Sequence, residues 1–240
     1  MSFNIKNYKL EIIMLLIIII PLLILGLAAI KNKKDFQVHG TNEISKINGE
    51  DLKPLELREY GGIKLDSVYD FRENSIKGPQ YIDINDYTLK ITGMVEEEKE
   101  YTYEEIINRS TRKKVAKLTC VEGWSVNLLW EGIVLRDLLK EANPNPEANK
   151  IIFHAYDGYT TNHHTEYIMD YDILMAHKMN NITLMPERGF PFQLVAEGEW
   201  GYKWVKWITE IEFTDDPDYR GYWEARGYSD TGKLGESFLD

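Results

Sequence analysis

The sequence predicts an α+β fold built on mixed β-sheets. Apolar and polar residues alternate over residues 87–92, which indicates a strand with one buried face. Residues 150–156 form a largely apolar run that ends at an Asp157-Gly158 turn, and the chain after the turn can return as a hairpin partner. Short helical patterns lie between the strands without a regular strand–helix–strand rhythm. That mixture favours α+β over a parallel α/β sheet.

Two short helices are predicted in the first half of the domain. Thr102 and Glu105 have the Thr-x-x-Glu spacing of a capping box, so a helix should begin there. Apolar residues recur at helical spacing over residues 134–139, and Asn143-Pro144 ends that segment.

The second half is predicted to contain one more short helix and two strands. The spacing of apolar residues over residues 172–179 predicts the helix. Residues 192–196 and 207–213 are predicted strands.

The N-terminal end predicts a membrane anchor over residues 1–35. Residues 12–30 are 19 positions without a charge. As a helix they would be about 28 Å long, close to the thickness of a bilayer core. The run is longer than the apolar part of a signal peptide and no Ala-x-Ala site follows, so we expect an uncleaved single-pass helix.

We therefore expect three regions and a cell-membrane location. Residues 36–66 are polar and are predicted to be a tether and docking arm, and residues 67–240 are predicted to form one globular domain. Two lysines precede the apolar run and three follow it, so the positive-inside rule does not fix the orientation. Our working expectation is an extracytoplasmic domain.

The charge of the chain excludes one class of partner. Residues 36–240 carry 23 basic and 37 acidic residues, a formal charge of −14. A surface of this sign repels nucleic acid, so no nucleic-acid partner is expected.

Cys120 is the single cysteine of the 240 residues. It cannot form an internal disulfide, which leaves three roles: buried filler, nucleophile, or thiolate ligand to a soft metal. The residue type alone does not decide among them.

The surroundings of Cys120 carry a family resemblance. Residues 118–125 read Leu-Thr-Cys-Val-Glu-Gly-Trp-Ser, and Trp-Glu-Gly follows at 130–132. This pattern resembles the cofactor loop of the sulfite oxidase family, specifically the bacterial oxidoreductase molybdopterin-binding domains. Four further segments resemble the family in the right order: 69–71, 87–93, 189–195 and 201–208.

The resemblance implies a β-rich mixed fold and a molybdenum–molybdopterin cofactor. Cys120 would hold the metal, and the reaction would transfer an oxygen atom with a two-electron change at molybdenum. The resemblance places these residues at the cofactor: Tyr69, Phe71, Arg188, Gln193, Trp204, Val205 and Lys206. Gln193 stands where many relatives have arginine, and a neutral amide weakens the inferred phosphate site.

The resulting expectation is a membrane-anchored molybdopterin-dependent oxidoreductase. The chain has no Cys-x-x-Cys-His, iron–sulfur cysteine set or Gly-x-Gly-x-x-Gly, so electrons must be exchanged with a separate redox partner. A quinone-linked or haem-containing membrane subunit would suit an anchored domain. A small oxyanion, a sulfoxide or an N-oxide would fit as the substrate.

Two alternatives remain open. A non-catalytic or cofactor-poor scaffold that binds a membrane partner is motivated by Gln193 and by the absence of a twin-arginine signal. A thiol hydrolase using Cys120 would need a histidine base, and no histidine lies in a recognisable partner motif.

Two further clusters contain residue types that can form sites. His163 and His164 are neighbours that would point to opposite faces of a strand, so even with His154 we expect a solvated turn rather than a metal site. Glu197 and Glu199 are expected in a water-exposed loop rather than as a catalytic pair.

Overall fold

The computed structural model describes residues 56–240. The predicted membrane segment over residues 1–35, and most of the predicted arm over residues 36–66, lie outside the described residues. Within residues 56–240, no helix has both the length and the apolar character needed to cross a bilayer.

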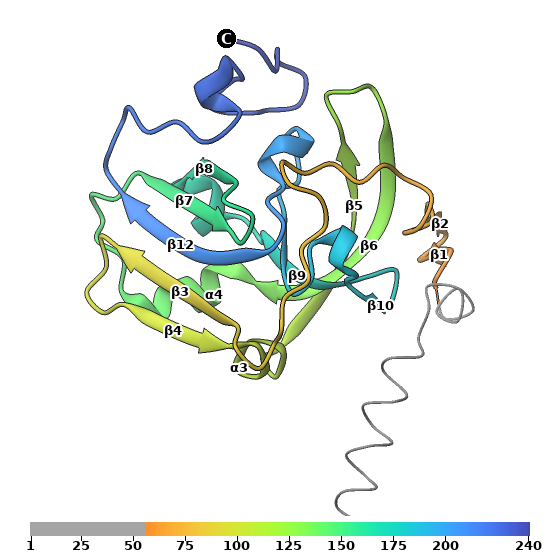
Figure 1. Cartoon of the computed structure of the whole chain (residues 1–240), viewed down its shortest axis with the longest axis horizontal. Helices are drawn as coiled ribbons and strands as arrows, with labels where there is room; N and C mark the ends of the chain where they lie inside the picture. Colours follow the sequence, from red (N-terminus) through yellow and green to blue (C-terminus); the bar gives the residue numbers. More distant parts are fainter. Residues whose placement is uncertain (1–55) are drawn as a thin grey trace, which may run out of the picture. The chain divides into compact units, whose positions relative to one another are not determined.

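One five-stranded sheet has the order β4-β3-β12-β7-β8 (Figure 1). The strand β12 pairs in parallel with β3 and antiparallel with β7, so this sheet is mixed, as predicted. The strands are β3 (Thr88–Gly93), β4 (Lys99–Thr102), β7 (Lys150–Ala155), β8 (Thr160–His164) and β12 (Ile208–Thr214). The β7–β8 hairpin and the strand predicted over residues 87–92 are both confirmed.

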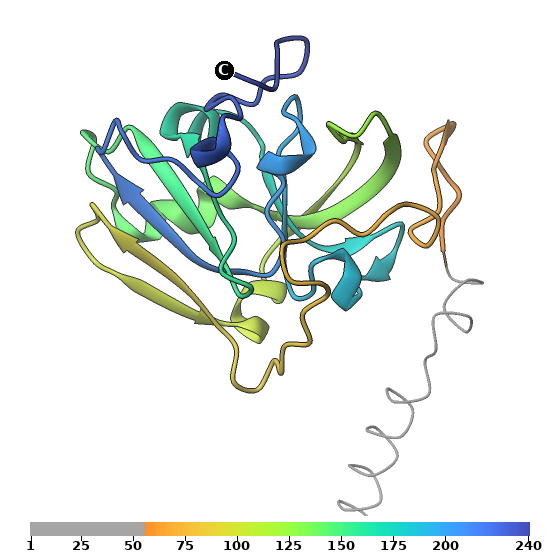
Figure 2. The same cartoon turned by 45° about the horizontal axis from the view of Figure 1, so that its top comes forward.

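The second sheet has the order β10-β9-β6-β5, with β11 also paired to β9, and all its pairs are antiparallel. In Figure 2 the two sheets can be told apart, with the first sheet on the left and the second on the right. Its strands are β5 (Thr111–Thr119), β6 (Ser125–Val134), β9 (Leu174–Met179), β10 (Ile182–Thr183) and β11 (Gln193–Val195). A separate hairpin joins β1 (Glu59–Tyr60) to β2 (Ile63–Lys64).

The helices are short. They are α3 (Tyr103–Ile107), α4 (Leu135–Leu139) and α5 (Thr165–Asp170), with 3₁₀ turns at η2 (Lys140–Ala142), η3 (Pro186–Arg188), η4 (Gly201–Lys203) and η5 (Glu224–Arg226). The predicted capping box is confirmed, since Thr102 Oγ1 accepts the Glu105 N–H and Glu105 accepts the Thr102 N–H. Asn143 ends the α4–η2 segment in the left-handed conformation.

The helix predicted over residues 172–179 is wrong, because residues 174–179 form β9. This strand pairs with β6 on one side and with β10 and β11 on the other. Both of its faces are largely buried, so its apolar residues do not alternate and the run resembles a helix in sequence.

Gly132 allows β6 and β9 to approach closely. A Cβ at this position would lie 2.1 Å from the Met175 carbonyl oxygen, and the pairing of the two strands shifts register between Glu131 and Gly132. The glycine of the Trp-Glu-Gly motif at 130–132 is therefore explained by the structure, since no larger residue fits at this bulge.

Candidate functional site

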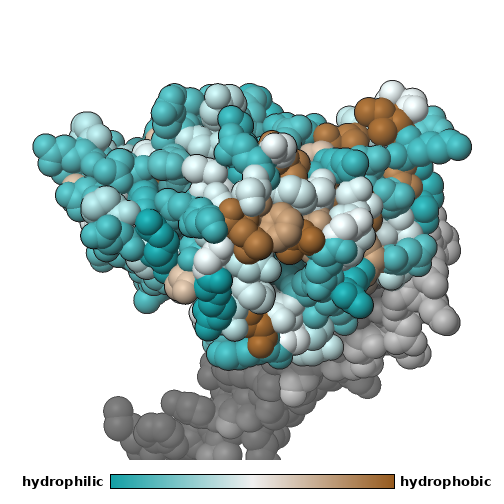
Figure 3. Space-filling view, turned by 90° about the horizontal axis from the view of Figure 1, so that it is seen from above, coloured by the Kyte–Doolittle hydropathy of each residue, from teal (hydrophilic) through white to brown (hydrophobic). Residues whose placement is uncertain are grey.

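A pocket of about 410 Å³ opens where three segments meet: residues 71–78, the turn between β5 and β6, and residues 201–207. Its volume lies in the usual range for small-molecule sites. Seen from above, the face with the β5–β6 turn and the C-terminal segment carries an apolar group near its centre, surrounded by hydrophilic side chains (Figure 3). The pocket itself has mixed lining, with Phe71, Ile76 and Val121 beside charged residues.

Cys120 lies at the end of β5, in a tight turn that presents its thiol to the pocket. The Cys120 N–H donates to Trp124 O at 2.9 Å, and the Gly123 N–H donates to Cys120 O at 3.1 Å. Gly123 has φ +89°, which glycine adopts at little cost. The sulfur Sγ receives the Glu122 N–H and the Asn74 amide, each at 3.5 Å.

Burial raises the pKa of the Cys120 thiol, and the two N–H donors only partly offset that effect. Without a cation beside it, the sulfur therefore favours the protonated form. A soft metal ion at the pocket would hold it as a thiolate, since a coordinating thiol is deprotonated. The surroundings of Cys120 thus suit a metal ligand better than a free nucleophile.

Aromatic side chains form much of the pocket wall. The rings of Phe71 and Trp124 lie 5.8 Å apart, and those of Trp223 and Tyr228 lie 5.0 Å apart. All four residues line the pocket. These rings provide an apolar surface for a ligand in the same pocket as the thiol.

Arg188 is buried in the wall and is held by backbone carbonyl groups. Its Nε donates to Val68 O at 2.8 Å and its Nη2 to Phe71 O at 2.7 Å. The guanidinium stacks 3.6 Å from the centre of the Phe71 ring. Burial lowers the pKa of Arg188. This arginine therefore anchors residues 68–71, which lead into the pocket-lining segment 71–78. Most of its N–H donors are already bonded to backbone carbonyl groups.

Lys206 is a largely buried cation, with 14% of its side chain exposed. Its Nζ lies 2.5 Å from Glu73 Oε1 and 3.4 Å from Glu187 O, above the Trp207 ring. Burial lowers the pKa of Lys206, and Glu73 opposes that shift. Gly189 has φ +88°, and a Cβ there would lie 2.9 Å from Lys206 Cγ, so this glycine leaves room for the lysine stem.

The other predicted cofactor residues differ in their distance from the pocket. Gln193 is buried on β11 and forms an isolated β-bridge with Lys206. Trp204 donates its indole N–H to Glu199 O at 3.0 Å. Val205 joins Gln193 and Trp204 in lining the pocket, whereas Tyr69 does not line it. Cys120 and six of the seven predicted neighbours therefore surround one cavity, and Tyr69 lies outside its lining.

Among the pocket residues that were not predicted from the sequence, three polar ones contact the thiol, Lys206 or Arg72. Glu73 pairs with Lys206, Asn74 donates to the thiol, and Glu122 accepts from Arg72 at 3.0 Å. The polar run after Phe71 was the available signal. It gives no hint of partners that are 46 to 133 residues away in the chain.

The segment 199–206 rests on buried polar groups. Lys203, fully buried, places Nζ 2.6 Å from Glu224 Oε1 and 3.0 Å from Asn162 O. Tyr159 donates its hydroxyl to Tyr202 O. These contacts fix the backbone of residues 204–206, whose side chains line the pocket wall.

The solvated turn expected at His163 is wrong. His163 is buried on β8, with Nε2 3.1 Å from Lys203 O and Nδ1 2.8 Å from Glu199 Oε2. Glu199 is buried too, which corrects the exposed loop expected there, whereas Glu197 is exposed and pairs with Lys114. The contact of His163 with Lys203 O ties β8 to the pocket segment.

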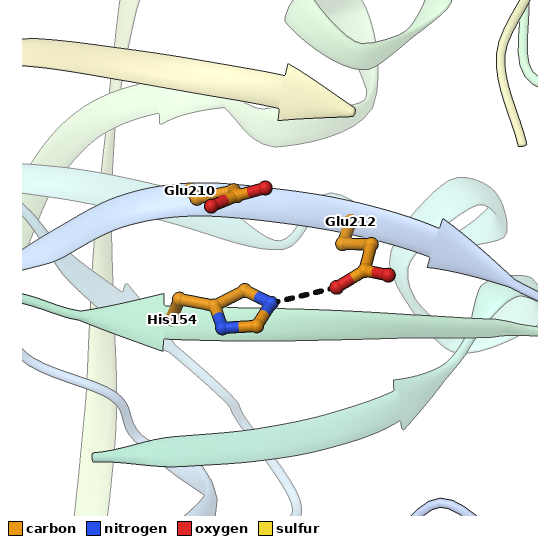
Figure 4. Close-up of side chains that lie close together, drawn as sticks. All are labelled: His154, Glu210 and Glu212. Atoms are coloured by element: carbon orange, nitrogen blue, oxygen red, sulfur yellow. Dashed lines mark hydrogen bonds and ion pairs between the residues drawn. The ribbon is translucent and has the colours of Figure 1, made fainter. Parts of the chain in front are cut away.

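His154 lies in a different cluster from His163. It extends from β7 beside Glu210 and Glu212 of β12, and its Nε2 is 2.9 Å from Glu212 Oε2 (Figure 4). Thr92 donates to Glu210 at 2.6 Å. The three side chains are partly exposed and are bonded within the sheet face, so the cluster is explained by its own hydrogen bonds.

The fold combines one mixed and one antiparallel sheet, and the pocket places a single thiol with a buried arginine and a largely buried lysine, an arrangement suited to an enzyme that binds a metal cofactor. A family model described as the oxidoreductase molybdopterin-binding domain matches residues 76–223. The chain belongs to this family, and the predicted molybdenum-cofactor-dependent oxidoreductase class and its molybdenum–molybdopterin cofactor are confirmed.

Individual relatives agree with this assignment. The chain is 30% identical over 151 residues to the uncharacterized oxidoreductase YuiH of Bacillus subtilis, covering 62% of this chain and 76% of YuiH. It is 29% identical to the protein-methionine-sulfoxide reductase catalytic subunit MsrP of Gluconobacter oxydans, covering 54% of this chain and 47% of MsrP.

A solved structure supports the fold. The sulfane dehydrogenase SoxCD of Paracoccus pantotrophus matches with a TM-score of 0.55 and 25% identity, over 58% of this chain and 41% of that one. The predicted β-rich, mixed-sheet fold of the sulfite oxidase type is therefore confirmed.

Proposed function

We propose that this chain is a membrane-anchored oxidoreductase that transfers an oxygen atom at a molybdenum held by Cys120. The observation that carries the proposal is the placement of the thiol in the pocket. A soft donor, two N–H groups directed at it and a buried lysine line one cavity. This donor set fits a metal bound to a phosphate-bearing pterin.

When bound, the cofactor supplies a metal whose oxidation state changes by two electrons when an oxygen atom is transferred to or from the substrate. The residues of the chain hold and orient it. Cys120 donates its sulfur, while Asn74 and the Glu122 N–H reduce the charge density on that sulfur and so tune its donation. Lys206 and the adjacent backbone would face the phosphate, and the ring of Phe71 shields the site from water.

The pocket favours a neutral sulfoxide over a bare oxyanion as the substrate. Among the residues the structure describes, the pocket's arginines and lysine all have partners: Arg72 with Glu122, Arg188 with carbonyl groups, and Lys206 with Glu73. A bare oxyanion would need one of these cations. The aromatic wall suits the organic part of a sulfoxide. The relative MsrP, a protein-methionine-sulfoxide reductase catalytic subunit, supports the same substrate class.

Electrons would come from a separate membrane partner. The chain holds one cysteine, so it has no set of thiols for an iron–sulfur cluster of its own. A quinone-linked or haem-containing subunit at the membrane would serve an anchored domain. The N-terminal apolar run supports an anchored arrangement, and we place the folded domain on the extracytoplasmic side as part of this proposal.

A substrate comparison tests the proposal. The full chain, purified from a host that makes the cofactor, is assayed with a reduced viologen dye against a methyl sulfoxide, nitrate and an N-oxide. We expect turnover to be highest for the sulfoxide and absent in Cys120→Ser. Equal or higher turnover of nitrate would overturn the substrate class. Full turnover by Cys120→Ser would overturn the metal ligand.

A further inference from the structure

The Glu73–Lys206 pair places a carboxylate in front of the largely buried lysine that lines the pocket. Glu73 Oε1 lies 2.5 Å from Lys206 Nζ, while Glu73 Oε2 accepts the Ser75 hydroxyl at 3.2 Å. The two paired side chains are 23% and 14% exposed, so this is a partly buried ion pair rather than a surface contact. Such pairs are worth more than exposed ones because water screens them less.

The other cations at the pocket differ from Lys206. Arg188 donates to Val68 O and Phe71 O, and breaking these bonds would detach residues 68–71 from the pocket wall. Arg72 is 67% exposed and pairs with Glu122 near the rim. Lys206 also reaches the Glu187 carbonyl at 3.4 Å, but its only charged partner among the described residues is Glu73, a side chain that can rotate away.

We propose that Glu73 occupies the position of the cofactor's phosphate while the pocket is empty, and that loading exchanges this carboxylate for the phosphate on Lys206. This inference rests on the proposed function. The exchange keeps Lys206 paired with an anion in both states, which a buried ammonium requires. The released Glu73 carboxylate retains Ser75 as a partner and reaches solvent.

Glu73 thus sets how tightly the cofactor is held. In the loaded protein the phosphate must compete with a carboxylate attached to the same chain. Gln193 adds no charge to the phosphate side, so Lys206 is the main cation for which the two anions compete. Removing the carboxylate should favour loading, because the empty protein loses an ion pair that the loaded protein has already replaced.

Glu73→Gln and a matched control test this exchange. Glu187→Gln removes the same charge from the pocket lining, and among residues 56–240 the Glu187 side chain forms no ion pair. Molybdenum and pterin per chain are measured during serial dilution of the full-length protein. We expect Glu73→Gln to lose cofactor several-fold more slowly than wild type, and Glu187→Gln to change little. Equal or faster loss from Glu73→Gln overturns the exchange, since Glu73 would then assist Lys206 in the loaded state.

A second measurement separates this inference from the proposed function. Protein made in a host without the cofactor is titrated with inorganic pyrophosphate, and the melting temperature is followed. The empty Glu73→Gln protein should melt below wild type, and pyrophosphate should raise its melting temperature more than that of wild type or Glu187→Gln. If wild type never carries molybdenum, the proposed function fails while the titration still decides the exchange. If the two variants respond equally to pyrophosphate, that result contradicts the exchange.

Discussion

At the residue scale, Cys120 shows what one side chain can and cannot reveal. Its type left three roles open, and the surrounding motif selected metal ligation. The structure adds two donors to the thiol: the Glu122 N–H, which lies within the same motif, and the Asn74 amide, which is 46 residues away and could not be inferred from the sequence. Local motifs find the ligand, whereas the contacts that tune it come from the fold.

Cys120→Ser tests the ligand directly. The hydroxyl is close in size to the thiol and can accept the same N–H groups, so the fold should remain and the melting temperature should change by only a few degrees. An alcohol is a poor soft donor, so redox turnover should fall by at least about a hundredfold. Thermal melts and dye-linked turnover are the measurements. A variant that keeps both turnover and molybdenum removes Cys120 from the role.

Gln193→Arg tests the departure from the family pattern. The new guanidinium would lie beside Lys206, and like charges in a buried site destabilise the empty protein. With phosphate bound, a charge-assisted bond should add about 1 kcal/mol. We expect a lower melting temperature without cofactor and slower cofactor loss during gel filtration. Faster loss would mean that residue 193 does not face the phosphate.

His177 gives a pH dependence that is independent of the site. Burial lowers its pKa from the ordinary value of 6.5, helped by Lys178 and opposed by Glu131. The unfolded chain therefore takes up the proton first, so stability is lost as the pH falls through 6.5. The lowered pKa values of Glu131 and Glu141 act only below about 4.5. The free energy of unfolding in urea is measured between pH 7.5 and 5.5. His177→Gln should reduce the dependence of this free energy on pH, and an unchanged dependence would contradict the assignment to His177.

At the element scale, local signals predicted α3, α4 and the β7–β8 hairpin correctly, whereas α5 was not predicted. The capping box of α3 and the left-handed end after α4 are encoded by nearby residues. The strand β9 was missed because its identity depends on β6 and β11, which pair with it from distant parts of the chain. Local patterns are informative where one face is exposed and fail where both are buried.

Thr102→Ala tests the contribution of the capping box. The change removes the acceptor of the Glu105 N–H and should cost about 1 kcal/mol. The expected shift in melting temperature is a few degrees, with cofactor content unchanged because α3 does not line the pocket. Glu104→Ala, on the same helix but outside the box, is the control. An equal effect of the two variants would assign the loss to helix propensity.

At the scale of the whole molecule, the pocket joins segments that are far apart in the chain. The resemblance identified Cys120 and six residues that line one cavity, since motif residues converge in the fold. It could not identify the Glu73–Lys206 pair or the buried Lys203–Glu224 pair, because each depends on how loops pack together. The pairing of these buried lysines with carboxylates is the main feature that can be learned only from the structure.

The central claim is that this pocket holds molybdenum through Cys120. The most direct test is molybdenum per chain in the full-length protein purified from a host that makes the cofactor, compared with Cys120→Ser prepared in parallel. We predict close to one molybdenum per wild-type chain and a loss of metal from the variant that exceeds its loss of pterin. A folded wild-type protein without molybdenum, or equal metal in both proteins, would contradict the account.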